Sequence, residues 1–132
     1  MKKKVTISII LFLVIVIIVT MLNPIRRSTG HIRESLLTLM PIGTSMEDVI
    51  KVIEGKSKWK RMFVSDDGGY YVGYGYPSGA VKGTTVGVKS IYVLLGTYNT
   101  YMFIDTYVEA FWGFDEEGKL IEIDVRKSYD VL

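Results

Sequence analysis

The chain of 132 residues contains no cysteine and a single histidine, His31. Disulfides, a cysteine nucleophile paired with histidine, and zinc sites built from several Cys and His ligands are therefore excluded. A lipid attached to cysteine is excluded for the same reason. A histidine base would need a nucleophile from elsewhere in the chain. We therefore predict no catalytic residue, no metal site and no cofactor.

A large excess of charge is also missing, with 16 Lys and Arg against 14 Asp and Glu. Five of the basic residues lie in the first 27 positions, which leaves 11 basic and 14 acidic residues in the remainder. Nucleic-acid binding needs a basic patch on the folded part of a protein. No nucleic-acid partner is therefore expected.

The first 27 residues form a leader with basic flanks. Lys2 to Lys4 precede an uncharged apolar run from Val5 to Leu22, which at about 1.5 Å per residue approaches the thickness of a bilayer. No small-x-small cleavage site follows at the usual distance. We therefore predict an uncleaved transmembrane helix that contacts the lipid bilayer through residues 5–22. Residues 28–132 would then form a small extracytoplasmic domain at the cell membrane, with the short basic tail in the cytoplasm.

Two short helices are expected after the leader. Ser28 or Thr29 can cap the first helix, and Pro41 and Gly43 end it. Its apolar residues form one broad stripe, made of Ile32, Leu36, Leu37, Leu39 and Met40. The second begins at a capping box that runs from Thr44 to Glu47. Gly55 fits the left-handed position that follows the last turn of a helix.

From Trp59 onward, β-branched and aromatic residues separated by turn residues predict antiparallel strands. We expect strands at 59–64, 70–76, 91–98, 101–114 and 120–127, and an exposed loop or irregular edge strand at 77–90. The acidic clusters 66–67 and 115–117 lie beside glycines, which favours turns over catalytic carboxylates or calcium ligands. The predicted fold class is α+β: an N-terminal transmembrane helix, then two short helices packed on one face of a 4-5 stranded antiparallel sheet.

Two short motifs carry a resemblance to a known family. They are Gly43-Thr44-Ser45-Met46-Glu47-Asp48-Val49-Ile50, which leads to Gly55, and the hairpin motif Phe-Asp-x-x-Gly-Lys-Leu from Phe114 to Leu120. Together with the aromatic strand between them, they resemble the SmpA/OmlA (BamE-like) family of small envelope domains, whose fold is similar to that of β-lactamase inhibitor protein. The resemblance implies a non-enzymatic domain that binds other envelope proteins.

The first candidate binding surface is the tyrosine-rich strand 70–76. Alternation along a strand places Tyr70, Tyr74 and Tyr76 on one face. Three tyrosines in register make a flat amphipathic surface suited to protein or sugar contacts. The alternative is that these tyrosines only cover the helices or the sheet.

The second candidate surface lies on the last hairpin. With Gly118 as the bulge residue, Phe114 pairs with Leu120. Continuing that register gives the helices an apolar face to cover, made of Phe111, Gly113, Ile121, Ile123 and Val125. The opposite face then holds Val108, Trp112 and Phe114 among charged residues, a composition typical of protein-binding patches. The alternative is that the 77–90 loop folds back over this second face.

These patterns predict a non-catalytic, membrane-anchored extracytoplasmic domain that binds a protein partner in the cell envelope or a second copy of itself. It is not expected to be an enzyme. The alternative function is a cell-wall glycan-binding module that uses the tyrosine-rich strand.

Overall fold

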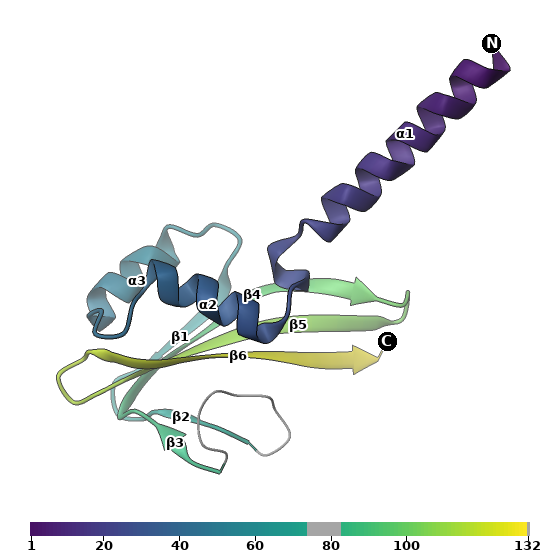
Figure 1. Cartoon of the computed structure of the whole chain (residues 1–132). Coiled ribbons are helices and arrows are strands. Elements are labelled where there is room, and N and C mark those ends of the chain that lie inside the picture. The colour runs from purple at the N-terminus through teal and green to yellow at the C-terminus, as the bar shows by residue number, and fades with distance from the viewer. Residues whose placement is uncertain (74–82, 132) are drawn as a thin grey trace.

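The computed structural model describes residues 1–73 and 83–131, and Figure 1 shows their arrangement. The helices are α1 (Lys2–Met21), the 3-10 helix η1 (Pro24–Arg26), α2 (Thr29–Leu39) and α3 (Met46–Glu54). The strands are β1 (Lys60–Ser65), β2 (Tyr70–Tyr71), β3 (Thr85–Val86), β4 (Lys89–Thr100), β5 (Ile104–Phe114) and β6 (Leu120–Val131). Helix α1 extends away from one end of a body formed by the other elements.

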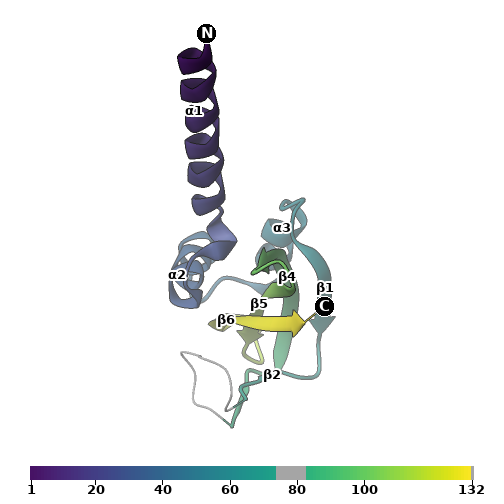
Figure 2. The same ribbon diagram turned by 90° about the vertical axis from the view of Figure 1, so that its right-hand side faces the viewer.

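A four-stranded antiparallel sheet in the order β1-β4-β5-β6 forms the centre of this body. Strands β2 and β3 form a separate antiparallel pair. Figure 2 shows the sheet between helices α2 and α3 on one side and the β2–β3 hairpin on the other. The predicted α+β architecture, with short helices on one face of an antiparallel sheet, is therefore confirmed.

Helix α1 corresponds to the apolar leader, and its residues up to Val19 are exposed. No helix in the described part of the chain is both long enough and apolar enough to cross a membrane. The prediction of a transmembrane helix through residues 5–22 is therefore wrong. Lys2 to Lys4 form the first turn and the helix ends at Met21, so its uncharged part is shorter than the about 20 residues that a crossing helix needs.

Helix α2 follows the predicted pattern. Ser28 is its N-cap, and the Ser28 hydroxyl accepts a hydrogen bond from the backbone N–H of His31 at 3.2 Å. Ile32 and Leu36 lie one turn apart and are both buried against the sheet. The helix is therefore stabilised by its cap and by one apolar stripe.

Helix α3 begins one residue later than the capping box predicts. Ser45 is the N-cap and accepts from the backbone N–H of Asp48 at 3.2 Å, whereas the Thr44 hydroxyl donates to the Pro41 carbonyl at 2.6 Å. The capping box at Thr44 is thus wrong, because the preceding turn already engages that hydroxyl. Gly55 has φ −72°, so its predicted left-handed conformation is wrong as well.

The strand boundaries differ from the prediction at several places, and β6 for example continues to Val131 instead of residue 127. Strand β4 continues to Thr100, so the turn that joins it to β5 consists of Tyr101, Met102 and Phe103 instead of residues 99–100. In the tyrosine-rich segment, the strand covers only Tyr70 and Tyr71 of the described residues, paired with β3. The rest of that segment from residue 74 on, and residues 77–82 of the predicted 77–90 loop, lie outside the described part. Residues 83–90 are described, and they contain β3 and the first two residues of β4 instead of an unbroken loop.

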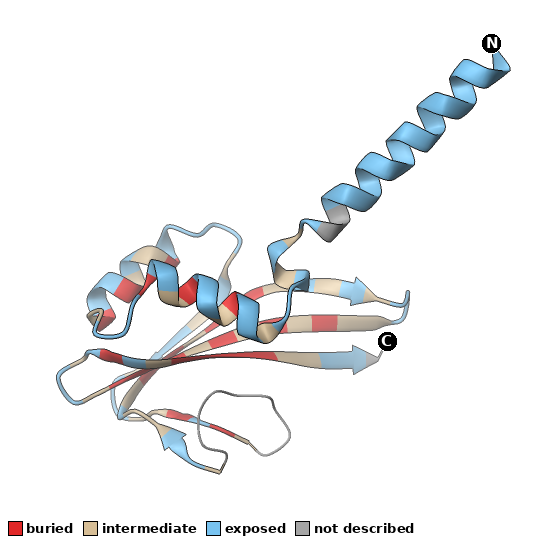
Figure 3. Ribbon diagram, viewed as in Figure 1, coloured by how far each residue is buried: buried red, intermediate tan, exposed pale blue. Residues whose placement is uncertain are grey.

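The hydrophobic core lies between the sheet and helices α2 and α3, as the buried residues in Figure 3 show. Trp112 and Phe114 are fully buried there, and the rings of Trp59 and Trp112 are 6.2 Å apart. The same core includes Met40 and Val49 from the helical segment. We call this side of the sheet the inner face.

The pairing of β5 with β6 explains which residues reach the inner face. Phe114 pairs with Leu120, as predicted, but the next pair is Gly113 with Glu122, so Ile121 is an extra residue. A bulge of one residue moves every following side chain to the other face of the sheet. Trp112 consequently pairs with Ile123 and faces the helices, and the predicted assignment of Phe111 and Gly113 to the helix-covered face is wrong.

Candidate functional site

An aromatic row crosses the outer face of the sheet, the face turned away from α2 and α3. Phe63 on β1 pairs in register with Tyr92 on β4, which pairs with Phe111 on β5. The ring centroids are 5.9 Å apart between Phe63 and Tyr92, and 5.2 Å apart between Tyr92 and Phe111. Alternation along each strand brings these three rings to one surface. Phe63 is 66% exposed, so the row is open to solvent at the β1 edge.

A groove of about 430 Å³ lies along this row, and we call it the outer-face groove. Strands β1, β4 and β5 supply its floor, and the β2 segment supplies one wall. It is lined by Phe63, Val64, Ser65, Gly69, Tyr70, Tyr71, Ser90, Ile91, Tyr92, Phe111 and Arg126. Most of these side chains are apolar or aromatic, which is the composition of a binding surface for apolar groups.

A buried charge pair lies beneath the closed end of the groove. Arg126 donates from Nε to Asp124 Oδ2 at 3.3 Å, and both side chains are buried. The guanidinium also lies 4.2 Å from the centroid of the Phe111 ring and donates to the Tyr71 carbonyl. Hydrogen bonding and ring stacking offset the cost of burying this charge. Arg126 therefore holds the β2 segment onto the sheet.

Tyr70 closes the groove from the β2 side. Its ring lies 5.5 Å from that of Phe111 and it is only 5% exposed. Gly113 permits this approach, because a Cβ at that position would lie 3.1 Å from the Tyr70 ring and 2.8 Å from Val86. Within the described residues, the Tyr70 hydroxyl has no hydrogen-bond partner. Burial, followed by the nearby carboxylates Asp124 and Glu122, raises the Tyr70 pKa well above 10, so the hydroxyl stays protonated.

Tyr92 carries the polar group nearest the middle of the row. Its hydroxyl donates to Glu109 Oε1 at 2.7 Å, and Ser128 donates to the other oxygen of Glu109 at 3.3 Å. Burial and this hydrogen bond raise the pKa of Tyr92 to about 12. Tyr92 is therefore a neutral hydrogen-bonding group at physiological pH and cannot act as a base there.

The groups around the groove are suited to binding. The Arg126 guanidinium is held by Asp124 and the Tyr71 carbonyl, and the Tyr92 hydroxyl is held by Glu109, while the Tyr70 hydroxyl is buried in the wall of the groove. No group of three or more possible metal ligands occurs within the described part of the chain. His31 lies on α2, where its Nε2 is 2.7 Å from the Arg27 guanidinium. It is not among the residues that line the groove.

Most of the described site residues predicted from the sequence do not line the outer-face groove. Val108, Trp112 and Phe114 are fully buried in the helix-covered core, so the prediction that they form an exposed binding patch is wrong. The bulge at Ile121 is the physical reason, because it exchanges the two faces. Tyr70 lies in the wall of the groove but is buried, and Tyr74 and Tyr76 lie outside the described residues.

The aromatic row itself was missed at the sequence level. Phe63 and Tyr92 lie on the two strands that were predicted at 59–64 and 91–98, and Phe111 was assigned to the core. Alternation in each strand is visible in the sequence, but the pairing of β1 with β4 joins segments almost 30 positions apart. That pairing leaves no local signal in the sequence.

The acidic clusters form turns, as predicted for residues 115–117. Asp115 Oδ1 accepts from the backbone N–H of Glu117 at 3.0 Å and of Lys119 at 2.9 Å. In the other cluster, Asp67 Oδ1 accepts from the Ser65 hydroxyl at 3.2 Å. Asp115 therefore stabilises the turn of the β5–β6 hairpin, and Asp67 stabilises the connection between β1 and β2.

No protein-family model matches the chain, and no curated protein or solved structure shows significant similarity to it. The resemblance to the SmpA/OmlA family accordingly stays a prediction. The site is argued from its own geometry.

Proposed function

We propose that this chain is a non-catalytic binding domain whose outer-face groove holds an apolar segment of a protein partner. The observation that carries the proposal is the row Phe63–Tyr92–Phe111, which leaves the Phe63 ring 66% exposed on the face turned away from α2 and α3. Aromatic residues at the centre of a depression commonly anchor protein interfaces. Placement of the domain in the cell envelope stays a prediction.

The edge strand β1 favours an extended protein segment as the occupant. β1 is at the edge of the four-stranded sheet, and its residues from Phe63 to Ser65 pair regularly with β4 on one side. The other side of this short stretch leaves backbone groups available to an added strand. A partner strand there would bring alternate side chains to the groove.

Charge along the same edge favours an acidic partner segment. Lys58, Lys60 and Arg61 are all exposed where the chain enters β1. The folded part of the chain is acidic overall, so this basic strip stands out against it. Attraction between opposite charges steers association and suppresses unsuitable partners.

The glycan-binding alternative has less support. It depended on Tyr70, Tyr74 and Tyr76 as an exposed platform, but Tyr70 is buried and turned onto Phe111. The Tyr92 hydroxyl and the Arg126 guanidinium are also engaged, the first by Glu109 and the second by Asp124 and the Tyr71 carbonyl. A sugar would need free donors and acceptors beside the rings.

Site-specific photo-crosslinking in intact cells tests the proposal. A benzoylphenylalanine residue in place of Phe63 is expected to form a discrete protein adduct, whereas the same residue in place of Glu117, which is exposed on the β5–β6 turn, is not. Reversing the charge of Lys60 and Arg61 should weaken the adduct. Equal labelling at both positions, or an adduct that persists unchanged after charge reversal, would contradict the proposal.

A further inference from the structure

The turn between β4 and β5 exposes three consecutive apolar side chains. Tyr101 is 83% exposed, Met102 79% and Phe103 64%. We call this segment the apolar tip. Tight hairpin turns normally contain Asn, Asp or Gly, whose side chains tolerate water and unusual backbone angles. Large apolar residues at such a place are costly in water and indicate a surface that is covered when the protein acts.

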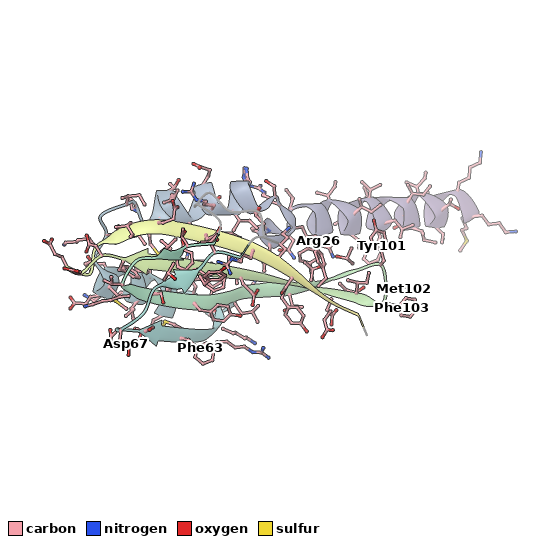
Figure 4. The ribbon with its side chains drawn as sticks, turned by 90° about the horizontal axis from the view of Figure 1, so that it is seen from below. Arg26, Phe63, Asp67, Tyr101, Met102 and Phe103 are labelled. Atoms are coloured by element: carbon pink, nitrogen blue, oxygen red, sulfur yellow. The ribbon has the colours of Figure 1, made fainter. Side chains whose placement is uncertain are left out.

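The backbone of the tip also has unusual dihedral angles. Tyr101 has φ 53° and Met102 has φ 45°, in the left-handed region that glycine and asparagine normally occupy. Two adjacent non-glycine residues in the left-handed region raise the free energy of the folded chain. Such backbone strain is often found at binding sites. The conformation directs the side chains outward from the end of the hairpin, as Figure 4 shows.

The tip lies at the end of the sheet from which α1 extends, which both Figure 1 and Figure 4 show. The α1 side chains from Val5 to Val19 are exposed and apolar on all sides apart from Thr6 and Ser8. A helix without a polar face requires an apolar environment. Within the described residues, the tip and α1 thus place two exposed apolar surfaces at one end of the sheet.

Basic side chains surround the base of the tip. Arg26 donates to the Asn99 carbonyl at 3.4 Å, and its guanidinium lies 4.7 Å from the Tyr98 ring centroid. Lys127 Nζ lies 5.2 Å from the same ring and donates to the Arg27 carbonyl at 2.7 Å.

Two acidic side chains lie at the same end of the sheet. They are Asp105 and Asp130, which are paired across β5 and β6, and Asp105 accepts from the Asn99 side chain at 3.2 Å. Among the described residues at this end, the three basic side chains of Arg26, Arg27 and Lys127 outnumber the two acidic ones, which makes the net charge around the tip positive.

We propose that the apolar tip inserts into the interfacial region of a lipid bilayer that contains anionic lipids. Tyrosine, phenylalanine and methionine on a protruding turn can leave water together while the rest of the sheet stays in place. Their aromatic and apolar character is that of residues that anchor proteins at the membrane–water interface. Arg26, Arg27 and Lys127 then lie at the level of the anionic headgroups. Insertion of the tip requires no membrane-crossing helix.

The absence of cysteine permits a direct test in the full chain. Met102→Cys supplies a unique attachment point for an environment-sensitive fluorophore, and Glu117→Cys, on the turn at the opposite end of the sheet, supplies the matched control. Both labelled chains are mixed with vesicles of phosphatidylcholine and phosphatidylglycerol in equal amounts. The label at position 102 should shift to the blue and be quenched by brominated acyl chains, while the label at position 117 should do neither.

A further variant measures the contribution of the tip. Phe103→Asp in the Met102→Cys chain should lower the ratio of inserted to free tip by about tenfold, since burial of one phenylalanine is worth at least that factor. Intrinsic tryptophan emission, which comes from Trp59 and Trp112 in the core, should be unchanged, which shows that the fold is retained. Replacing phosphatidylglycerol by phosphatidylcholine should weaken insertion.

Three results would overturn the proposal. The first is a chain that does not bind the vesicles, and the second is a bound chain whose label at position 102 gives the same spectrum as the label at position 117. The third is a blue shift without vesicles that grows with protein concentration, since a second copy of the chain would then cover the tip.

Discussion

The two faces of the central sheet are built from the same strands but differ in what covers them. On the inner face, Ile91, Ala110 and Trp112 are fully buried beneath α2, α3 and the chain that joins them. On the outer face, Tyr92 and Phe111 are partly exposed, and Phe63 is mostly exposed. Both faces are rich in apolar side chains, so composition alone does not distinguish a core from a binding surface. What distinguishes them is whether the chain supplies its own cover.

The β2–β3 hairpin covers the outer face only in part. It covers β5 and β6 around Gly113 and Arg126 and leaves the β1 and β4 side open. The open part coincides with the aromatic row. Substitutions on the covered inner face should therefore cost far more stability than substitutions on the open part of the outer face.

Trp112→Ala should destabilise the protein most, by about 4 kcal/mol, because it leaves a large cavity in a fully packed core. Phe63→Ala, on the exposed end of the outer face, should change the free energy of unfolding by much less than 1 kcal/mol, as is usual for surface substitutions. Urea denaturation of both variants checks this. Equal losses would mean that the two faces do not differ as described.

Asp124→Ala should cost about 3 kcal/mol, because it leaves the Arg126 guanidinium buried without its carboxylate. Asp130→Ala, at an exposed position on the same strand, is the matched control and should be nearly neutral. The comparison of the two unfolding curves separates a buried pair from a general effect of charge on β6. A neutral Asp124→Ala would show that the pair does not hold the hairpin.

Gly113→Ala should cost about 2 kcal/mol, since the added methyl group would lie within 3.1 Å of Tyr70 and Val86 and would push the β2–β3 hairpin off the sheet. Hydrogen exchange at Tyr70 and Val86 should become faster while exchange in the helices is unchanged. Gly30→Ala is the control, because a methyl group there meets no atom within 4 Å. Unchanged exchange in the hairpin would contradict the packing argument.

Ser45→Ala should cost about 1 kcal/mol through loss of the α3 N-cap. Thr44→Ala should cost less, because its hydroxyl bonds only to the preceding turn. Thermal unfolding of the two variants decides which residue is the cap. A larger loss for Thr44→Ala would restore the capping box that the sequence indicates.

The smallest expected effect is a loss of stability at high pH, when Tyr92 on the outer face is deprotonated. The pKa of Tyr92 is about 12 in the folded protein and near 10 when unfolded, so its contribution to stability is present below pH 10 and is lost as the pH rises through 12. Glu109→Gln removes the carboxylate acceptor and should lower the Tyr92 pKa. Ultraviolet titration of the phenolate checks the shift. An unchanged titration curve in Glu109→Gln would contradict the hydrogen-bond explanation.

The sequence predicts the elements of this fold better than their faces. Capping of α2 at Ser28 or Thr29, the apolar stripe of α2 and the turn chemistry around Gly118 are predicted from local signals. The structure confirms the stripe and the turn, and selects Ser28 as the cap. The assignment of Trp112 to the surface failed because of one extra residue, Ile121. Neither the composition nor the periodicity of the sequence shows where such a bulge lies. The bulge nevertheless decides which residues of the strand face the core and which face the surface.

The groove was beyond sequence-based prediction for a different reason. Its residues come from β1, β2, β4, β5 and β6, and only the pairing of these strands brings Phe63, Tyr92 and Phe111 together. Each of those rings is an ordinary strand residue when viewed locally. The buried Arg126–Asp124 pair is a similar case, because its burial depends on the β2–β3 hairpin lying over β6.

The central claim is that the outer-face groove binds a protein segment, and the most direct test compares binding with stability in one variant. Once photo-crosslinking has identified the partner, its affinity is measured for the unaltered chain, for Phe63→Ala and for the control Tyr129→Ala, which lies exposed on β6. We predict an affinity for Phe63→Ala that is lower by about tenfold, the usual effect of losing an interface anchor, with an unchanged unfolding temperature and no change for Tyr129→Ala. Full affinity in Phe63→Ala would contradict the account.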